Sequence, residues 1–111
     1  RFSIKKAKVK GKYTLVDFGA AWCSPCHVFA QRLEPFLTET DLLAVRAVEL
    51  GVDAKTSFDH PVVFQHLSNA EGIPWFILFN PKGQKMYEGN DQDEVFKLLD
   101  EHKILNQQEP E

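Results

Sequence analysis

The apolar residues of this chain fall into runs with strand spacing and runs with helical spacing, separated by turn residues. Tyr13 to Phe18 is mostly apolar and ends at Gly19, which predicts a largely buried strand. Apolar residues then recur at helical spacing from about Ser24 to Thr38, where Pro35 is expected to kink or fray the last turns. The run from Leu43 to Leu50 predicts a second strand.

The middle of the chain predicts a loop and a short helix before a third strand. Gly51 to Asp59 is expected to be a loop, and Pro61 then opens a short helix, because proline is favoured at the first helical position. The apolar face of this helix comprises Val63, Phe64 and Leu67. Trp75 to Phe79 is again wholly apolar and predicts a buried strand.

The last third of the chain predicts a hairpin and a capped helix. The segment Asn80 to Gly83 has proline second and glycine fourth, so Gln84 to Tyr87 should return as an antiparallel strand. Asp91 followed by Glu94 resembles a capping box at the start of a final helix. The apolar stripe of this helix comprises Val95, Leu98 and Leu99. The polar tail from Asn106 to Glu111 is expected to fray.

This order of elements predicts an α/β domain. The first strand, helix and second strand form a parallel crossover, and the hairpin adds an antiparallel pair, so we expect a central mixed sheet of four or five strands with helices on both faces. The chain has 111 residues, of which 43% are hydrophobic. That is enough for one hydrophobic core, and we expect a single domain over residues 1–111.

Charge and hydropathy exclude several classes of partner. The net charge of −3 argues against a nucleic acid or an anionic membrane surface. The basic cluster near the start is expected to be a solvated edge; it comprises Lys5, Lys6, Lys8, Lys10 and Lys12. The apolar run Trp75 to Phe79 is far too short to span a bilayer, so no membrane insertion is expected. The chain begins at Arg1 without an apolar signal region, which suggests a processed product or an excised domain.

The chemistry is concentrated in the segment Trp22-Cys23-Ser24-Pro25-Cys26, which holds both cysteines of the chain. Two thiols separated by two residues can close a small disulfide ring, and this spacing after a strand is typical of a redox site. We expect Cys23 in the first turn of the helix, where the helix dipole lowers its pKa below about 8.5, and Cys26 one turn deeper. Cys23, expected to be the outer and more exposed sulfur, would then attack, and Cys26, the inner one, would resolve.

Three other interpretations compete for these cysteines. A structural disulfide is disfavoured, because so short a loop removes little entropy from the unfolded chain. A zinc site would need four ligands, and His60, His66 and His102 form no second paired motif, so no metal is expected. Cys23 to His27 also fits C-x-x-C-H, the attachment signature of c-type haem, for which Met86 could serve as a distal ligand.

Several motifs together resemble the thioredoxin superfamily in matching order, from about Lys12 to His102. They are Val16-Asp17-Phe18, Ala21 to Cys26, Gly72-Ile73-Pro74 leading into Trp75 to Phe79, and then Gly83 and Gly89. The long stretch between Cys26 and Gly72 is more similar to the C-terminal domain of the bacterial transmembrane thiol:disulfide interchange protein than to cytosolic thioredoxin. A cysteine motif that follows a buried strand also disfavours haem, since a c-type cytochrome surrounds this motif with helices and loops.

The resemblance implies a thioredoxin fold and a thiol:disulfide oxidoreductase. It implies no cofactor, protein or peptide disulfides as substrates, and a partner protein that reduces or oxidises the cysteine pair. It favours a periplasmic or other extracytoplasmic location, with the cytoplasm as the alternative. A non-catalytic module that binds peptides near Trp22 and Trp75 is the alternative function.

The resemblance also implies a substrate groove beside the cysteines. In this family the proline at position 74 is cis and faces the cysteine pair, and the residue before it, here Ile73, offers backbone groups to an extended substrate. Trp75 departs from the threonine more often found after this proline, and either belongs to the core or narrows the groove. Trp22 is expected to form part of the apolar contact surface.

Asp17 matches the buried acid of thioredoxins. A carboxylate in a buried strand is costly unless it is paired or protonated, so we expect a raised pKa. The family role implied for Asp17 is to accept and return the proton of Cys26. Glu49 stands where thioredoxins commonly have a lysine, and should raise the pKa of Asp17 further. His27 is expected to be an exposed helix residue, and the brief segment before Tyr13 leaves room for a core of four strands.

Overall fold

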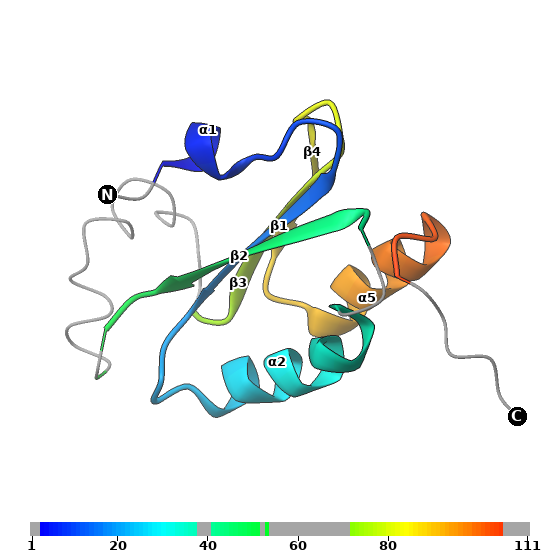
Figure 1. Ribbon diagram of the computed structural model, residues 1–111. Helices are drawn as coiled ribbons and strands as arrows, with labels where there is room; N and C mark the ends of the chain where they lie inside the picture. The colour runs from blue at the N-terminus through cyan, green and yellow to red at the C-terminus, as the bar shows by residue number, and fades with distance from the viewer. Residues whose placement is uncertain (1–2, 38–40, 52, 54–71, 106–111) are drawn as a thin grey trace, which may run out of the picture.

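A four-stranded mixed sheet forms the centre of the computed structural model, which describes residues 3–37, 41–51, 53 and 72–105 (Figure 1). The strands are β1 (Tyr13–Gly19), β2 (Leu43–Glu49), β3 (Trp75–Phe79) and β4 (Lys85–Gly89), in the spatial order β2-β1-β3-β4. β1 is parallel to β2 and antiparallel to β3, and β3 is antiparallel to β4. The predicted mixed sheet is confirmed, with four strands in the described part of the chain.

Helices flank both faces of this sheet. They are α1 (Ile4–Ala7), α2 (Ser24–Leu37) and α5 (Gln92–Glu101). α2 and α5 cover the same face, and α1 lies on the opposite one (Figure 1). Side chains of β1 divide between the two faces, because successive residues of a strand point in opposite directions: Leu15 packs in the core beneath α2 and α5, and Val16 packs in the core beneath α1.

The larger core joins α2, α5 and the sheet through aromatic contacts. The Phe29 ring of α2 lies 4.4 Å from that of Phe76 in β3 and 5.3 Å from that of Phe96 in α5, measured between centroids. Phe29 and Phe76 are both fully buried. Burial of one such side chain stabilises the fold by about 1.5–3 kcal/mol, so this contact fixes α2, which holds the cysteines, firmly against the sheet.

The hairpin and the last helix form as predicted, except that β4 begins one residue later than expected. The carbonyl of Asn80 accepts from the N–H of Gly83, whose φ of +82° suits glycine. The side chain of Asn80 accepts from the N–H of Gln84, which keeps Gln84 in the turn, so β4 begins at Lys85 and not at Gln84 as predicted. Asp91 caps α5, since its carboxylate accepts from two N–H groups of the first turn.

The segment before β1 carries the basic cluster, of which Lys5, Lys6, Lys10 and Lys12 are exposed as predicted and Lys8 is half-buried. It contains α1, whose Ala7 is buried against the sheet, although Lys5 and Lys6 are exposed. Lys8 reaches the hairpin: its ammonium donates to the carbonyl of Gly83 at 3.0 Å and lies 4.5 Å from the centroid of the Phe79 ring. The helix α1 was not predicted, because this lysine-rich segment lacks the apolar periodicity that indicates a helix.

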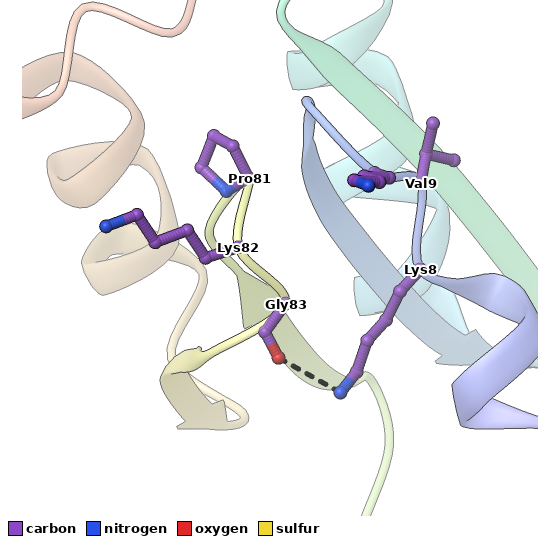
Figure 2. Close-up of a pocket in the computed structure, with 6 residues that line it drawn as sticks. Lys8, Val9, Pro81, Lys82 and Gly83 are labelled. Atoms are coloured by element: carbon purple, nitrogen blue, oxygen red, sulfur yellow. Dashed lines mark hydrogen bonds between the residues drawn. The ribbon is translucent and has the colours of Figure 1, made fainter.

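Lys8 and the hairpin turn line an open cavity of about 460 Å³ at the end of the sheet away from the cysteines (Figure 2). The side chain of Lys82 points away from the bond between Lys8 and Gly83 (Figure 2). The N-terminal segment is thus attached to the turn between β3 and β4.

Two predicted elements lie outside the described residues, namely the short helix from Pro61 and the polar tail from Asn106 to Glu111. Within the described residues, no helix is long and apolar enough to cross a membrane.

Candidate active site

Cys23 and Cys26 are joined in a disulfide at the start of α2, with their Cα atoms 5.3 Å apart. The helix begins at Ser24, so Cys23 occupies the N-cap position and Cys26 lies in the first turn. This corrects the predicted placement of Cys23 inside the first turn. The sulfur of Cys23 accepts a hydrogen bond from the N–H of Cys26 at 3.3 Å, which is the bond that a capping side chain makes.

The N-cap position has a direct electrostatic consequence for Cys23. The first N–H groups of a helix have no intrahelical partner and carry the positive end of the helix dipole. A thiolate at Cys23 would receive both effects, because its sulfur already accepts one of these N–H groups. The position therefore favours a negative charge on Cys23 after reduction.

Both cysteines are buried, which differs from the expected exposure of Cys23. Cys23 is 2% exposed and Cys26 is 8% exposed. They form a small apolar cluster with Ala20, against which Ile73 packs. Relative exposure thus does not distinguish the two sulfurs, and the N-cap hydrogen bond is what sets Cys23 apart.

The predicted groove residues Ile73 and Pro74 lie beside the cysteines. Ile73 is partly exposed and contacts the cysteine cluster, whereas Pro74 is buried. The peptide bond between them is cis, as the resemblance implies. Pro74 leads directly into β3, whose first residue pairs with Phe18 at the end of β1. The sheet register therefore brings this loop next to the segment that carries Cys23.

The two tryptophans have different surroundings. Trp22, next to Cys23, is 39% exposed and provides apolar surface at the site. Trp75 is half-buried in the core beneath α1, and its indole N–H donates to the carboxylate of Glu88 at 3.1 Å. Burial raises the pKa of Glu88, but hydrogen bonds from Lys85 and Trp75 outweigh it and hold that pKa below its usual range. Trp75 is therefore anchored to β4.

Asp17 lies on the face of β1 that α2 covers, since it is two residues from Leu15 along the strand. It lines a cavity of about 230 Å³ together with Gly19, Cys26, His27 and Glu49. Its Oδ1 atom is buried and makes no hydrogen bond within the described part of the chain. A Cβ atom built on Gly19 would lie 3.3 Å from the sulfur of Cys26 and 3.9 Å from Oδ1 of Asp17. Glycine at position 19 thus leaves the space between these two groups open.

The surroundings of Asp17 favour its protonated form. Burial, and secondarily the negative charge of Glu49, raise the pKa of Asp17 from 3.8 to about 6. Both causes agree with the sequence prediction. At pH 7 the carboxyl group is still mostly ionised, so it is able to accept a proton.

A contact that the sequence did not predict joins α5 to the cysteine motif. The side-chain amide of Gln92 donates to the carbonyl of Pro25, between the two cysteines, at 3.0 Å. Arg32 of α2 reinforces it, with an ion pair to Asp93 at 3.0 Å. These partners are about sixty residues apart in the sequence, and no local pattern indicates that they meet. His27 is exposed as predicted, and its Nε2 donates to the carbonyl of Ala21 at 2.7 Å.

Two of the histidines weighed for a zinc site, His60 and His66, lie outside the described residues. Within the described ranges, no group of three or more His, Cys, Asp and Glu side chains is arranged to hold a metal ion. Attachment of c-type haem would use both cysteine sulfurs, and here these sulfurs are bonded to each other.

Comparison with solved structures identifies the fold. A thioredoxin f2 of Chlamydomonas reinhardtii superposes with a TM-score of 0.63, at 19% identity, over 86% of this chain and 83% of that one. The thioredoxin domain of a thiol-disulfide oxidoreductase from Bacteroides vulgatus gives a TM-score of 0.57, at 20% identity, over 84% of this chain and 80% of that one.

Sequence comparison identifies the family. A thioredoxin of Mycolicibacterium smegmatis is 41% identical over 71 residues, which cover 61% of this chain and 56% of that protein. Thioredoxin-T of Drosophila melanogaster is 30% identical over 94 residues, which cover 82% of this chain and 54% of that protein. The chain thus spans little more than half the length of these two relatives. The family model of the thioredoxin-like domain matches residues 2–103, and the chain belongs to this family.

Proposed function

We propose that this domain is a thiol:disulfide oxidoreductase that reduces disulfides in proteins or peptides through Cys23 and Cys26. The observation that supports it most directly is the disulfide at the N-terminus of α2, in which the sulfur of Cys23 accepts a helix N–H group. The family membership and the apolar surface of Trp22 beside Cys23 agree with this proposal.

The reaction begins from the reduced pair. The Cys23 thiolate attacks one sulfur of the substrate disulfide, a mixed disulfide forms, and the other substrate sulfur leaves as a thiolate. Cys26 then attacks the sulfur of Cys23. The Cys23–Cys26 disulfide forms, and the second substrate sulfur leaves as a thiolate. Two electrons pass from the cysteine pair to the substrate, and a partner protein must return them for the next cycle.

Asp17 serves the second step in this proposal. Cys26 is a thiol until it attacks, and the nearby carboxylate of Asp17 accepts its proton. The space above Gly19, which the sulfur of Cys26 and Oδ1 of Asp17 both border, supports this transfer. We expect Asp17→Asn to slow the resolution of the mixed disulfide on the order of 100-fold, since amides do not accept protons near neutral pH.

Substrate binding uses the loop before β3. Ile73 contacts the cysteine cluster and is partly exposed, so its backbone can pair with an extended substrate segment. Trp22 adds apolar contact area. Trp75 packs in the core beneath α1 and is anchored to Glu88, so of the two roles predicted for it these contacts favour the core role.

The test is turnover. The wild-type chain should accelerate the reduction of insulin disulfides by dithiothreitol, and the double variant Cys23→Ser/Cys26→Ser should not. A wild-type chain that binds unfolded peptides but does not accelerate reduction would instead be a peptide-binding module.

The direction of electron flow is part of the proposal. Ser24-Pro25 resembles the Gly-Pro pair of reducing members of the fold, which favours a reductase. We therefore expect a reduction potential below about −200 mV, closer to thioredoxin than to strong oxidants. Equilibration with glutathione buffers measures it, and a value near −120 mV would indicate an oxidase.

An extracytoplasmic location completes the proposal, supported by the resemblance to the domain of the interchange protein. Fractionation of the source cells, with detection of this chain by antibody, tests it. Recovery in the cytoplasmic fraction would contradict it.

A further inference from the structure

A second acid shares the cavity of Asp17, and it comes from a different strand. Glu49 is the last residue of β2, and its register partner in β1 is Gly19. Asp17 pairs with Ala47, two residues before Glu49, so Glu49 lies diagonally across the parallel strands from Asp17. Because side chains alternate along a strand, Glu49 and Ala47 point to the same face as Asp17.

The two acids differ in exposure. Glu49 is exposed, whereas Oδ1 of Asp17 is buried. Both line the cavity of about 230 Å³, which has room for several water molecules at roughly 30 Å³ each. Glu49 is therefore the solvent-exposed acid of this cavity, and Asp17 is the buried one.

The other residues that line this cavity do not offset the negative charges of Asp17 and Glu49. α2 contributes Cys26 and His27 to the cavity, and the ring of His27 is held on the carbonyl of Ala21. β3 opposes Asp17 with Phe76, which is apolar. Among the described residues that line this cavity there is no lysine or arginine. Glu49 is thus the acidic neighbour that this cavity presents to Asp17.

We propose that Glu49 is a positioning residue that sets the pH below which Asp17 stops accepting the proton of Cys26. This inference rests on the proposed function and extends it to a residue outside the cysteine motif. An ionised Glu49 disfavours a second negative charge nearby, so Asp17 holds a proton up to a higher pH than it would alone. The exchange reaction is then switched down in mildly acidic surroundings and is active at neutral pH.

The negative charge of Glu49 affects both the basicity of Asp17 and the pH range in which Asp17 can accept a proton. A base with a higher pKa takes the proton of Cys26 more readily, provided that the base is ionised at the working pH. Glu49 therefore strengthens Asp17 as a base at neutral pH and narrows the pH range in which it acts. A lysine at position 49 would do the opposite, because a positive charge stabilises the ionised carboxyl group.

The first measurement does not depend on activity. The carboxyl carbon of Asp17, labelled with ¹³C and assigned with Asp17→Asn, is titrated by NMR in the oxidised protein. We expect a midpoint of about 6 in the wild type. Glu49→Gln should lower it by about half a pH unit, the effect of one partly screened charge, and Glu49→Lys should lower it further. The matched control is Glu34→Gln, which removes an exposed acid of α2 that does not line this cavity and should leave the midpoint unchanged.

The second measurement is the rate at which Cys26 resolves a preformed mixed disulfide, followed against pH in a single turnover. The rate should fall about tenfold per pH unit below the NMR midpoint, and the inflection should move with that midpoint in both Glu49 variants. Equal midpoints in wild type and Glu49→Lys would overturn the inference.

The two measurements separate the inference from the proposed function. If the NMR midpoint moves but the rate profile does not, Asp17 is not the proton acceptor and the inference fails at the kinetic step. If the wild type shows no turnover of any disulfide, the proposed function fails, and the role assigned to Glu49 in the reaction fails with it even if the midpoint moves.

Discussion

At the scale of single residues, the two cysteines have environments that differ in hydrogen bonding more than in exposure. The sulfur of Cys23 is the N-cap acceptor of α2, whereas Cys26 faces Gly19 and borders the cavity of Asp17. One sulfur therefore lies where a thiolate is stabilised, and the other lies where a proton acceptor is close. This asymmetry fits an attacking and a resolving cysteine.

The roles of the cysteines can be tested by single replacements. Cys23→Ser should abolish disulfide exchange, while Cys26→Ser should keep the nucleophile and accumulate mixed disulfides with its substrates, because the resolving thiol is absent. Mass spectrometry of the trapped species and the rate of iodoacetamide labelling measure this. Faster labelling of Cys26 than of Cys23 in the reduced wild type would contradict the assignment.

Gly19 offers a steric test of the path between Cys26 and Asp17. In Gly19→Ala the new methyl group would stand 3.3 Å from the sulfur of Cys26, a close contact, and 3.9 Å from Oδ1 of Asp17. We expect a loss of about 1 kcal/mol in the free energy of unfolding and slower resolution of mixed disulfides.

The matched control is Gly72→Ala, since a Cβ atom there would meet nothing within 4 Å. Its free energy of unfolding should stay the same or rise by about 0.5 kcal/mol. Denaturant titration of both variants decides it, and unchanged resolution in Gly19→Ala would show that the methyl group does not obstruct the transfer.

At the scale of elements, the start of α2 is positioned by β1 and by α5. The end of β1 leads into it, and Gln92 at the start of α5 donates to the carbonyl of Pro25. The aromatic contacts of Phe29 fix the next turn. The cysteine motif therefore sits on a supported helix end, which is the condition for reproducible geometry at a reacting sulfur.

The N-terminal segment is the element whose contribution to stability is easiest to isolate. Lys8→Met keeps the aliphatic chain but removes the hydrogen bond to Gly83 and the charge over the Phe79 ring. We expect a loss of about 1–2 kcal/mol in the free energy of unfolding, measured by denaturant titration. Lys10→Met is the control, since Lys10 is exposed on the same cavity. Equal stabilities of the two variants would show that the Lys8 contacts contribute nothing.

At the scale of the whole molecule, Asp17 links stability to pH. Its pKa is about 6 when folded and near 3.8 when unfolded, so between these values the folded state binds more protons. The free energy of unfolding should therefore fall as pH rises through this window, by about 3 kcal/mol at most, and the deficit persists at neutral pH.

Asp17→Asn should remove this pH dependence and stabilise the protein at pH 7. The gain should be about 1–2 kcal/mol, less than the full deficit, because the amide buries a donor of its own. Chemical denaturation between pH 4 and pH 7 compares the two proteins. A destabilised variant with unchanged turnover would identify Asp17 as a structural hydrogen-bonding group.

The order of the four strands, α2 and α5 was predictable from the sequence because it depends on local signals. Apolar periodicity, the turn at Asn80 to Gly83 and the cap at Asp91 each act over a few residues, and the structure confirms each of them. The mixed sheet also followed, since the parallel crossover from β1 to β2 and the hairpin of β3 and β4 leave few ways to order the strands. The prediction of a single domain over residues 1–111 stays a prediction.

Local signals failed where a contact joins distant segments. Nothing near Lys8 indicates the carbonyl of Gly83, 75 residues away, and nothing near Gln92 indicates Pro25. The same is true of burial at Cys23, because the residue that packs on the cysteines is Ile73 from another part of the chain. Such contacts depend on the register of the sheet and the packing of helices across it.

The sequence by itself indicated the disulfide ring, because two cysteines separated by two residues at the start of a helix are spaced to close it. The sequence also indicated that the pKa of Asp17 would be raised, since a carboxyl group in an apolar strand loses its hydration. The resemblance implied that Asp17 lies near Cys26 and Glu49, and the tertiary structure decided that all three line one cavity. Cys26, Asp17 and Glu49 come from three elements, and the parallel register of β1 and β2 brings the two acids into the cavity that Cys26 also lines.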